Sequence, residues 1–221
     1  MKTTTPGPLS GRRAEAARND SLILEAARAV FTADPAAPIA AVAERAGVGI
    51  GALYRRYRTK EELLQRLSLD GLNRYIAVVH AALEEEGDPW EAFAGFLRRA
   101  LEAGSGSLTV RFAGAFTATD ELREAGRTAY QLTQQLMERT KLAGVLRPDI
   151  EVTDVALLLE YLQAIQVRGQ ERTVRLRRRY LALLLDALRL TDAAPLPGPA
   201  PTWEDMSRRY EKELSPRRPP T

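Results

Sequence analysis

Residues 39–64 read IAAVAERAGVGIGALYRRYRTKEELL, and this stretch carries the strongest signal for the fold. Ile39, Val42 and Ala43 recur at helical spacing, and their apolar side chains share one face. Gly47 follows them at the position where a helix commonly ends in a left-handed residue. A second short helix comes directly after this turn. Two short helices joined in this way can place the second one in the major groove of DNA.

The second helix has an inner and an outer side. Val48, Ile50 and Leu53 are expected to pack back on the first helix, which leaves the remaining side chains facing outward. The segment 47–60 is positively charged, because it contains four arginine or lysine residues and no carboxylate. A surface of this charge favours contact with the phosphates of nucleic acid.

A third helix is predicted to begin after Thr59. Thr59 and Glu62 have the spacing of a capping box, in which the threonine hydroxyl caps the third amide and Glu62 reaches back to the backbone at the start of the helix. Lys60 lies in that first turn, where the helix dipole disfavours a cation. A phosphate bound at the free amides explains the lysine, and a solvated side chain of little cost is the alternative interpretation.

With these features the segment resembles the TetR family of bacterial one-component transcription regulators. The resemblance covers residues 13–66: RAEAARNDSLILEAARAVF is similar to the first helix of the family, and RAGVGIGALYRRYRTKEELL to its turn, recognition helix and fourth helix. The family often has serine or threonine in place of Gly49, threonine in place of Ala52 and histidine in place of Arg56. Two hydroxyl groups that often contact DNA are therefore missing.

The resemblance and the charges together predict a set of residues that contact double-stranded DNA. Arginines before and within the first helix form a basic arm, which can reach phosphates or the minor groove; for Arg12, a disordered solubilising tail is an equal alternative. The predicted set is Arg12, Arg13, Arg18, Gly49, Ile50, Gly51, Ala52, Tyr54, Arg55, Arg56, Tyr57 and Lys60.

Composition excludes several kinds of site. The chain has no cysteine and one histidine, His80, which removes thiolate chemistry and clusters of histidine ligands. We therefore expect no catalytic residues, no metal and no cofactor. No apolar run reaches the roughly 18 residues that span a membrane, and the N-terminus has no apolar core typical of a signal peptide. These features predict a cytoplasmic protein without a membrane partner.

The fold is predicted to be all-α, with a helix-turn-helix domain followed by a helical bundle. We expect a flexible basic arm at 1–12, the DNA-binding domain at 13–66, an effector-binding and dimerisation domain at 67–190, and a proline-rich tail with a short helix at 191–221. Within the bundle, Asp88 is expected to cap a helix that has Pro89 in its first turn. A short helix is expected around 108–117, and others at about 120–143, 152–168 and 172–190.

Aromatic and soft apolar residues gather in helices that the TetR family uses to line an effector cavity. Ordinary core packing is the alternative for each of them, and Glu160 could instead pair with an arginine across a dimer. The expected effector pocket contains Phe93, Phe96, Leu97, Phe112, Phe116, Tyr130, Met137 and Glu160. The helix at 152–168 is apolar nearly all round, and the helix at 172–190 is similar in its second half, so both should be buried on two sides. We expect them to form a homodimer interface with Leu158, Leu162, Leu184 and Leu188 at or beside it.

The functional hypothesis is a homodimeric repressor that binds a palindromic operator and is released by a small-molecule effector. An all-helical enzyme would need convergent acid, base or metal groups, whereas the acidic residues here stand at helix starts and on polar faces. A helical scaffold or adaptor with a basic surface is the remaining alternative. A strong preference for one DNA sequence would separate a regulator from such a scaffold.

Overall fold

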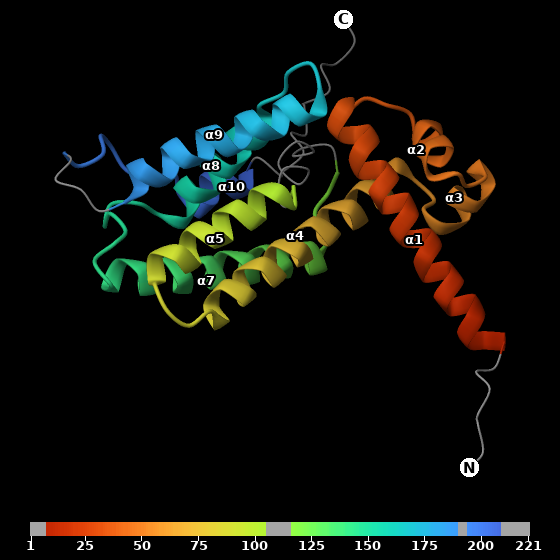
Figure 1. The fold of residues 1–221 in the computed structure, drawn as a ribbon. Coiled ribbons are helices and arrows are strands. Elements are labelled where there is room, and N and C mark those ends of the chain that lie inside the picture. Colours follow the sequence, from red (N-terminus) through yellow and green to blue (C-terminus); the bar gives the residue numbers. More distant parts are fainter. Residues whose placement is uncertain (1–7, 105–115, 190–193, 209–221) are drawn as a thin grey trace, which may run out of the picture. The chain divides into compact units, whose positions relative to one another are not determined.

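The computed structural model describes residues 8–104, 116–189 and 194–208. These residues form α-helices joined by turns, with one isolated bridge between Leu146 and Arg189, so the prediction of an all-α fold is confirmed. The chain divides into two compact units, Met1–Leu67 and Ser68–Thr221 (Figure 1).

The first unit contains α1 (Pro8–Ala33), α2 (Ile39–Ala46), α3 (Ile50–Arg56) and the beginning of α4 (Lys60–Glu84). Helix α1 packs along α2, and α2 packs against α3. The core of this first unit is apolar. It includes Ala27, Phe31, Val42, Leu53 and Leu63, none of which is exposed.

Helix α1 begins earlier than predicted. It starts at Pro8, within the segment that was expected to be a flexible arm. Proline is tolerated in the first turn of a helix because its missing N–H would have no partner there. The alanine, arginine and glutamate residues that follow have high helix propensity, and they continue the helix into the apolar part of α1.

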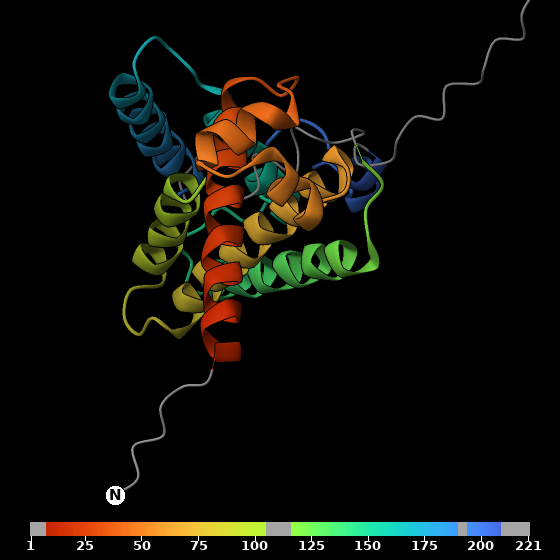
Figure 2. The same ribbon diagram turned by 90° about the vertical axis from the view of Figure 1, so that its right-hand side faces the viewer.

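The second unit is a helical bundle, seen from two directions in Figures 1 and 2. It contains the rest of α4, followed by α5 (Pro89–Glu102), α7 (Asp120–Leu142), α8 (Val152–Ala164), α9 (Gln170–Leu188) and α10 (Trp203–Arg208). Helix α5 is central, because it packs against α7, α8 and α9. The helix predicted around 108–117 lies mostly outside the described residues.

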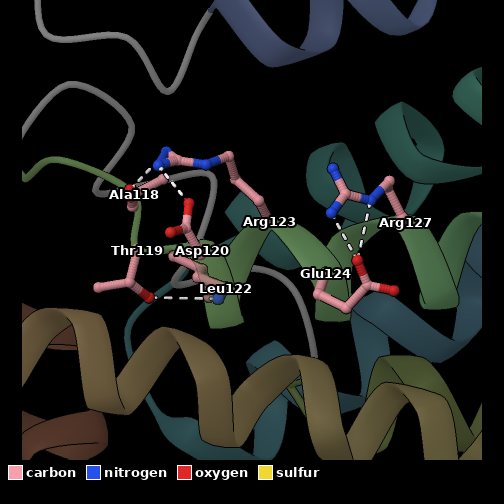
Figure 3. Close-up of polar contacts among 7 residues, drawn as sticks. All are labelled: Ala118, Thr119, Asp120, Leu122, Arg123, Glu124 and Arg127. Carbon is pink, nitrogen blue, oxygen red and sulfur yellow. Dashed lines mark hydrogen bonds and ion pairs between the residues drawn. The ribbon is translucent and has the colours of Figure 1, made fainter.

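The starts of α5 and α7 show why the bundle helices begin where they do. Asp88 accepts a hydrogen bond from the backbone N–H of Trp90 at 2.8 Å, and Pro89 occupies the first turn, as predicted. At α7, Thr119 accepts from the N–H of Leu122 at 3.2 Å (Figure 3). Arg123 adds a bond of 2.6 Å to the carbonyl of Ala118, so side chains satisfy backbone groups on both sides of this helix start.

Polar contacts fasten α4 to α7 inside the bundle. The hydroxyl groups of Tyr75 and Thr133 are hydrogen-bonded at 2.9 Å, and burial raises the pKa of Tyr75 to about 12. Arg139 donates to the carbonyl oxygens of Leu83 and Ala82, each at 2.9 Å. These carbonyls belong to the last turn of α4, where the helix itself offers no donor, so Arg139 caps the helix from a neighbouring element.

The tail returns to the bundle after α9. Residues 194–202 are not helical, as their prolines predict. Asp149 accepts two bonds from Arg147, at 2.7 and 2.9 Å, and a third from the N–H of Leu196 at 2.8 Å. These donors hold the pKa of Asp149 well below its usual value. The short helix α10 follows, with Met206 buried.

Candidate DNA-binding surface and effector region

The turn between α2 and α3 has the geometry that the sequence predicts. Gly47 has φ 66°, in the left-handed region where residues with a Cβ are disfavoured. Its N–H donates to the carbonyl of Glu44 at 3.1 Å, and the N–H of Val48 donates to Ala43 at 3.0 Å. These bonds close α2 and direct the chain at once into α3.

Helix α3 buries one side chain and exposes the rest of its predicted contact face. Leu53 is fully buried, and the exposed residues include Gly49, Gly51, Ala52, Tyr54 and Arg55. Small residues in the first turn would allow the backbone to approach a nucleic acid closely.

Ile50 differs from the packing prediction. It was expected to pack back on α2, but it is 44% exposed. Helix α3 has only seven residues and buries Leu53, so Ile50 in its first turn stays outside the core. Ile50 therefore stands with the predicted DNA-contacting residues, on the outer side.

Arg56 and Tyr57 are held together by Asp20 of α1, a residue that the sequence analysis did not single out. Arg56 donates from Nε to Oδ1 of Asp20 at 2.8 Å and from Nη2 to Oδ2 at 3.1 Å. The hydroxyl of Tyr57 donates to the same Oδ1 at 2.5 Å. The Asp20 side chain is 13% exposed and that of Arg56 is 53% exposed. A partly buried carboxylate thus binds a guanidinium that stays accessible.

Electrostatics agree with this geometry. Burial opposes ionisation of Asp20, but hydrogen bonds from Arg56 and Tyr57 outweigh it and lower the pKa of the carboxyl group. Burial, followed by the bond to Asp20, raises the pKa of Tyr57. Because the Tyr57 side chain is only 2% exposed, it belongs to the core of the unit and not to its outer face, contrary to its place in the predicted contact set. The contact between Tyr57 and Asp20 could not be predicted from local sequence patterns, because 37 residues separate the two.

Thr59, Glu62 and Lys60 organise the start of α4. The Thr59 hydroxyl accepts from the N–H of Glu62 at 3.1 Å, and the Glu62 carboxylate accepts from the N–H of Arg58 at 2.8 Å. Lys60 donates to the carbonyls of Ala37 at 2.8 Å and Pro35 at 3.2 Å. Its ammonium group also lies 5.0 Å from the ring centre of Phe31. These contacts account for a cation in the first turn, and they leave one of its three N–H donors for another partner.

Of the three arginines predicted in the basic arm, Arg18 is exposed on α1. The side chains of Arg12 and Arg13 lie outside the described residues, although their backbone is part of α1.

In the bundle, the predicted pocket residues form part of a closed core. Phe93, Phe96, Leu97 and Met137 are buried in one apolar cluster, and Tyr130 is partly buried against it. Phe116 is also buried, and Phe112 lies outside the described residues. The ring of Tyr75, which the sequence analysis did not include, meets Phe96 edge-on with 5.4 Å between the ring centres. The signal that could have identified Tyr75 was the helical spacing of the apolar residues around it on α4.

A narrow apolar cleft lies at a different place, between α5, α8 and α9. Its volume of about 10 Å³ corresponds to roughly one water molecule. The lining consists of leucine and valine side chains, namely Leu97, Val155, Leu158, Leu159, Leu162, Leu181, Leu184 and Leu188. All four leucines predicted at a dimer interface are among them, together with one residue of the predicted pocket. Among the described residues, no cluster of acidic or histidine side chains could hold a metal ion.

Both units match known family models. Residues 23–67 match the model of bacterial regulatory proteins of the tetR family, and residues 88–190 match the C-terminal domain of SbtR-like transcriptional regulators. The chain belongs to the TetR family of bacterial transcriptional regulators. No curated protein sequence matches the chain significantly.

Solved structures of other TetR regulators have the same fold. The regulator SCO0520 from Streptomyces coelicolor is 28% identical, with a TM-score of 0.57 over 78% of this chain and 99% of that one. A regulator from Mycobacterium vanbaalenii is 27% identical, with a TM-score of 0.57 over 80% and 99%. LfrR from Mycobacterium smegmatis, in complex with proflavine, is 20% identical and has a TM-score of 0.56 over 76% and 96%, a likeness of fold alone.

The leucines predicted at a dimer interface of this TetR-family protein divide into two pairs. Leu162 and Leu188 are 3% and 4% exposed and belong to the core of their own chain, whereas Leu158 and Leu184 are partly buried at its edge. The large apolar residues exposed on α8 and α9 include Tyr161, Leu183 and Tyr180, with exposed fractions of 67%, 55% and 47%. A helix that is apolar all round offers several stripes, so periodicity alone could not select the outward one.

Two further features complete the bundle of this regulator. Glu160 is half-buried on α8, next to the exposed Tyr161. In the part of the chain that the structure describes, no helix is both long and apolar enough to cross a membrane.

Proposed function

We propose that this TetR-family regulator is a homodimeric repressor that binds a palindromic operator through α3 and is released by a small-molecule effector. The observation that carries the proposal is the short pair α2 and α3, closed by Gly47 with φ 66°. The outer side of α3 presents small residues together with the side chains of Tyr54 and Arg55. A second helix of this kind docks in the major groove, where its outward side chains meet base edges.

Dimerisation is proposed through the exposed apolar side chains of α8 and α9. Tyr161, Tyr180 and Leu183 are large apolar side chains exposed to water on a single protomer, and covering them with a second copy is favourable. A symmetric dimer also accounts for adequate affinity, because two recognition helices would read two half-sites about one helical turn apart.

The effector site is proposed in the bundle, around α5 and α7. The apolar and aromatic side chains there favour an apolar or mixed-polarity ligand, and LfrR, a protein of the same fold, binds proflavine. Because these residues are closely packed, the cavity would belong to a second conformation whose population the ligand increases. Helix α4 is the covalent link to the recognition unit, and its contacts with α7 through Tyr75 and Arg139 would transmit the change.

Selection of bound fragments from genomic DNA, followed by footprinting, tests the operator. We expect a protected site with two-fold symmetry and two protomers per site. Protection of unrelated sequences with equal strength would instead support a basic scaffold. We propose no catalytic role and expect the protein in the cytoplasm, where the operator lies.

The effector is tested by calorimetry on the free and the operator-bound dimer. If effector and operator are coupled, each weakens the binding of the other by the same factor. Equal affinities of the ligand in the two titrations would show no coupling, and the aromatic cluster would then serve only as core.

A further inference from the structure

Asp20 is a carboxylate beside a surface proposed to bind DNA. Taken alone, a negative charge at such a place is unfavourable, because the phosphate backbone repels it and cationic contacts supply much of the affinity. Asp20 also loses water on burial, which opposes its ionisation. Both effects make a carboxylate unfavourable at this position. The contacts of Asp20 with Arg56 and Tyr57 indicate a compensating role.

Three contacts fix the Arg56 side chain. The carboxylate of Asp20 takes the edge formed by Nε and Nη2, at 2.8 and 3.1 Å. The guanidinium carbon also lies 5.2 Å from the centre of the Tyr57 ring, which adds a cation–π contact. Tyr57 in turn holds Asp20 through its hydroxyl at 2.5 Å. The long arginine side chain is therefore held in one place before any ligand arrives.

The contacts leave a defined set of donors. A guanidinium has five N–H groups, and Asp20 uses one on Nε and one on Nη2. The other edge, formed by Nη1 and the second hydrogen of Nη2, remains on a side chain that is 53% exposed. Two parallel donors of this spacing match the O6 and N7 acceptors of guanine in the major groove. Fixing the side chain beforehand also lowers the entropy lost when it binds.

We propose that Asp20 is a positioning residue for sequence recognition, which aligns Arg56 so that it reads a guanine in each half-site. This inference rests on the proposed function and deepens it, since it names a specificity-determining pair. Asp20 itself does not touch the base and acts through Arg56. Tyr57 supports it from the core of the unit.

Charge and positioning predict opposite results for Asp20→Asn. If Asp20 acts only as a negative charge, its removal should strengthen binding to every sequence. The matched control is Glu25→Gln, which removes the same charge from an exposed position of α1. If Asp20 positions Arg56, Asp20→Asn should lower operator affinity relative to random DNA by roughly tenfold to a hundredfold for each half-site, the range for one bidentate base contact. Glu25→Gln should leave that ratio unchanged.

The experiment measures the affinities of the full-length protein for its selected operator, for operators with one guanine replaced, and for random DNA, at one salt concentration. The variants are Asp20→Asn, Arg56→Ala, the double variant and Glu25→Gln. We expect Asp20→Asn to erase the preference for one guanine per half-site, and to have no further effect on it when Arg56 is already alanine. Tyr57→Phe keeps both charges and removes one bond to Asp20, so a smaller loss of the same preference is expected even if Asp20→Asn folds poorly.

Three results would overturn the inference. Asp20→Asn could strengthen operator and random DNA alike, as expected for Glu25→Gln. It could weaken both equally, which would make Arg56 a phosphate contact. Its effect on guanine preference could also persist in the Arg56→Ala background, which would show that it does not act through Arg56. Failure of the unmodified protein to prefer any selected sequence would instead refute the proposed function.

Discussion

In residues 8–67, polar side chains from different helices are tied to one another, whereas the core of residues 68–208 is held mainly by apolar packing. Asp20 joins α1 to Arg56 at the end of α3, and Lys60 joins α4 to the carbonyl groups of Pro35 and Ala37. The bundle instead buries one continuous cluster of leucine, valine, alanine and aromatic residues. Around this core, polar links still join elements: Tyr75 and Arg139 attach α4 to α7, and Arg178 of α9 pairs with Glu102 of α5 at 2.8 Å.

This difference suits the two proposed tasks. Hydrogen bonds and ion pairs depend on direction, so they hold donors in a fixed arrangement that a base sequence can match. Apolar packing has no preferred direction, and side chains of similar volume can rearrange around a ligand. The recognition unit therefore has a surface fixed by directional bonds, whereas the proposed effector cavity would require the closely packed core of the bundle to rearrange.

The largest expected effect separates core leucines from surface leucines in the bundle. Leu162→Glu should place an unpaired carboxylate inside the apolar cluster and destabilise the protein by about 3–5 kcal/mol. Leu183→Glu, on the same pair of helices but 55% exposed, should preserve the helical signal and shift the protein from dimer to monomer. Urea unfolding and sedimentation measure the two effects. A Leu183→Glu protein that stays dimeric at micromolar concentration would place the interface elsewhere.

A backbone effect is expected in the recognition unit. Gly47→Ala forces a Cβ into the left-handed region at φ 66° and should cost about 1–2 kcal/mol. Gly49→Ala is the matched control, because Gly49 has φ −64° and an added Cβ meets nothing within 4 Å at either glycine. Thermal unfolding of the two variants tests this. Equal stabilities would show that the turn tolerates other backbone conformations.

Lys60 tests whether a residue that is held internally also meets DNA. With two donors on backbone carbonyls and one remaining, Lys60 is expected to contact a phosphate. Lys60→Ala should weaken binding to all sequences alike and lower the salt dependence of log K by about one unit. Lys141→Ala, which removes a lysine from the bundle, is the control. If the slope is unchanged while stability falls, Lys60 acts only as a link between α4 and the turn before α2.

The smallest effect is a pH dependence of stability. The pKa of Asp20 is lower in the folded protein than its ordinary value of 3.8, so its contribution is present above that value and is lost as the pH falls through the folded pKa. Asp20→Asn should therefore lose less stability than the unmodified protein when the pH is lowered below about 4. Denaturant titrations between pH 2 and 6 measure this, with Glu25→Gln as control. Parallel curves for all three proteins would contradict the ion pair.

Local signals in the sequence predicted much of the fold. The glycine turn at Gly47, the threonine cap at Thr59 and the Asp88-Pro89 helix start depend on neighbouring residues, and each is confirmed. Partners that lie far apart in the chain were beyond such reasoning. Asp20 is 36 residues before Arg56, and no pattern links the two.

Burial on apolar helices was the other gap. Phe93 and Phe96 on α5 are of a residue type that is common both in protein cores and in ligand cavities. Only the structure shows that both side chains are fully buried here. Leu162 and Leu188 were equally ambiguous, because α8 and α9 have apolar residues on more than one face. The sequence thus predicted which helices are apolar, but not which of their faces is turned outward.

Recognition of a DNA sequence by α3 and its supporting residues underlies all of these proposals. It can be measured by a competition titration of the protein, with the selected operator against random DNA of equal length at physiological salt. We predict that the operator binds about a thousandfold more tightly or better, as specific regulators do. Affinities within a few fold of each other would contradict the account, because a basic surface without sequence recognition would then explain the binding.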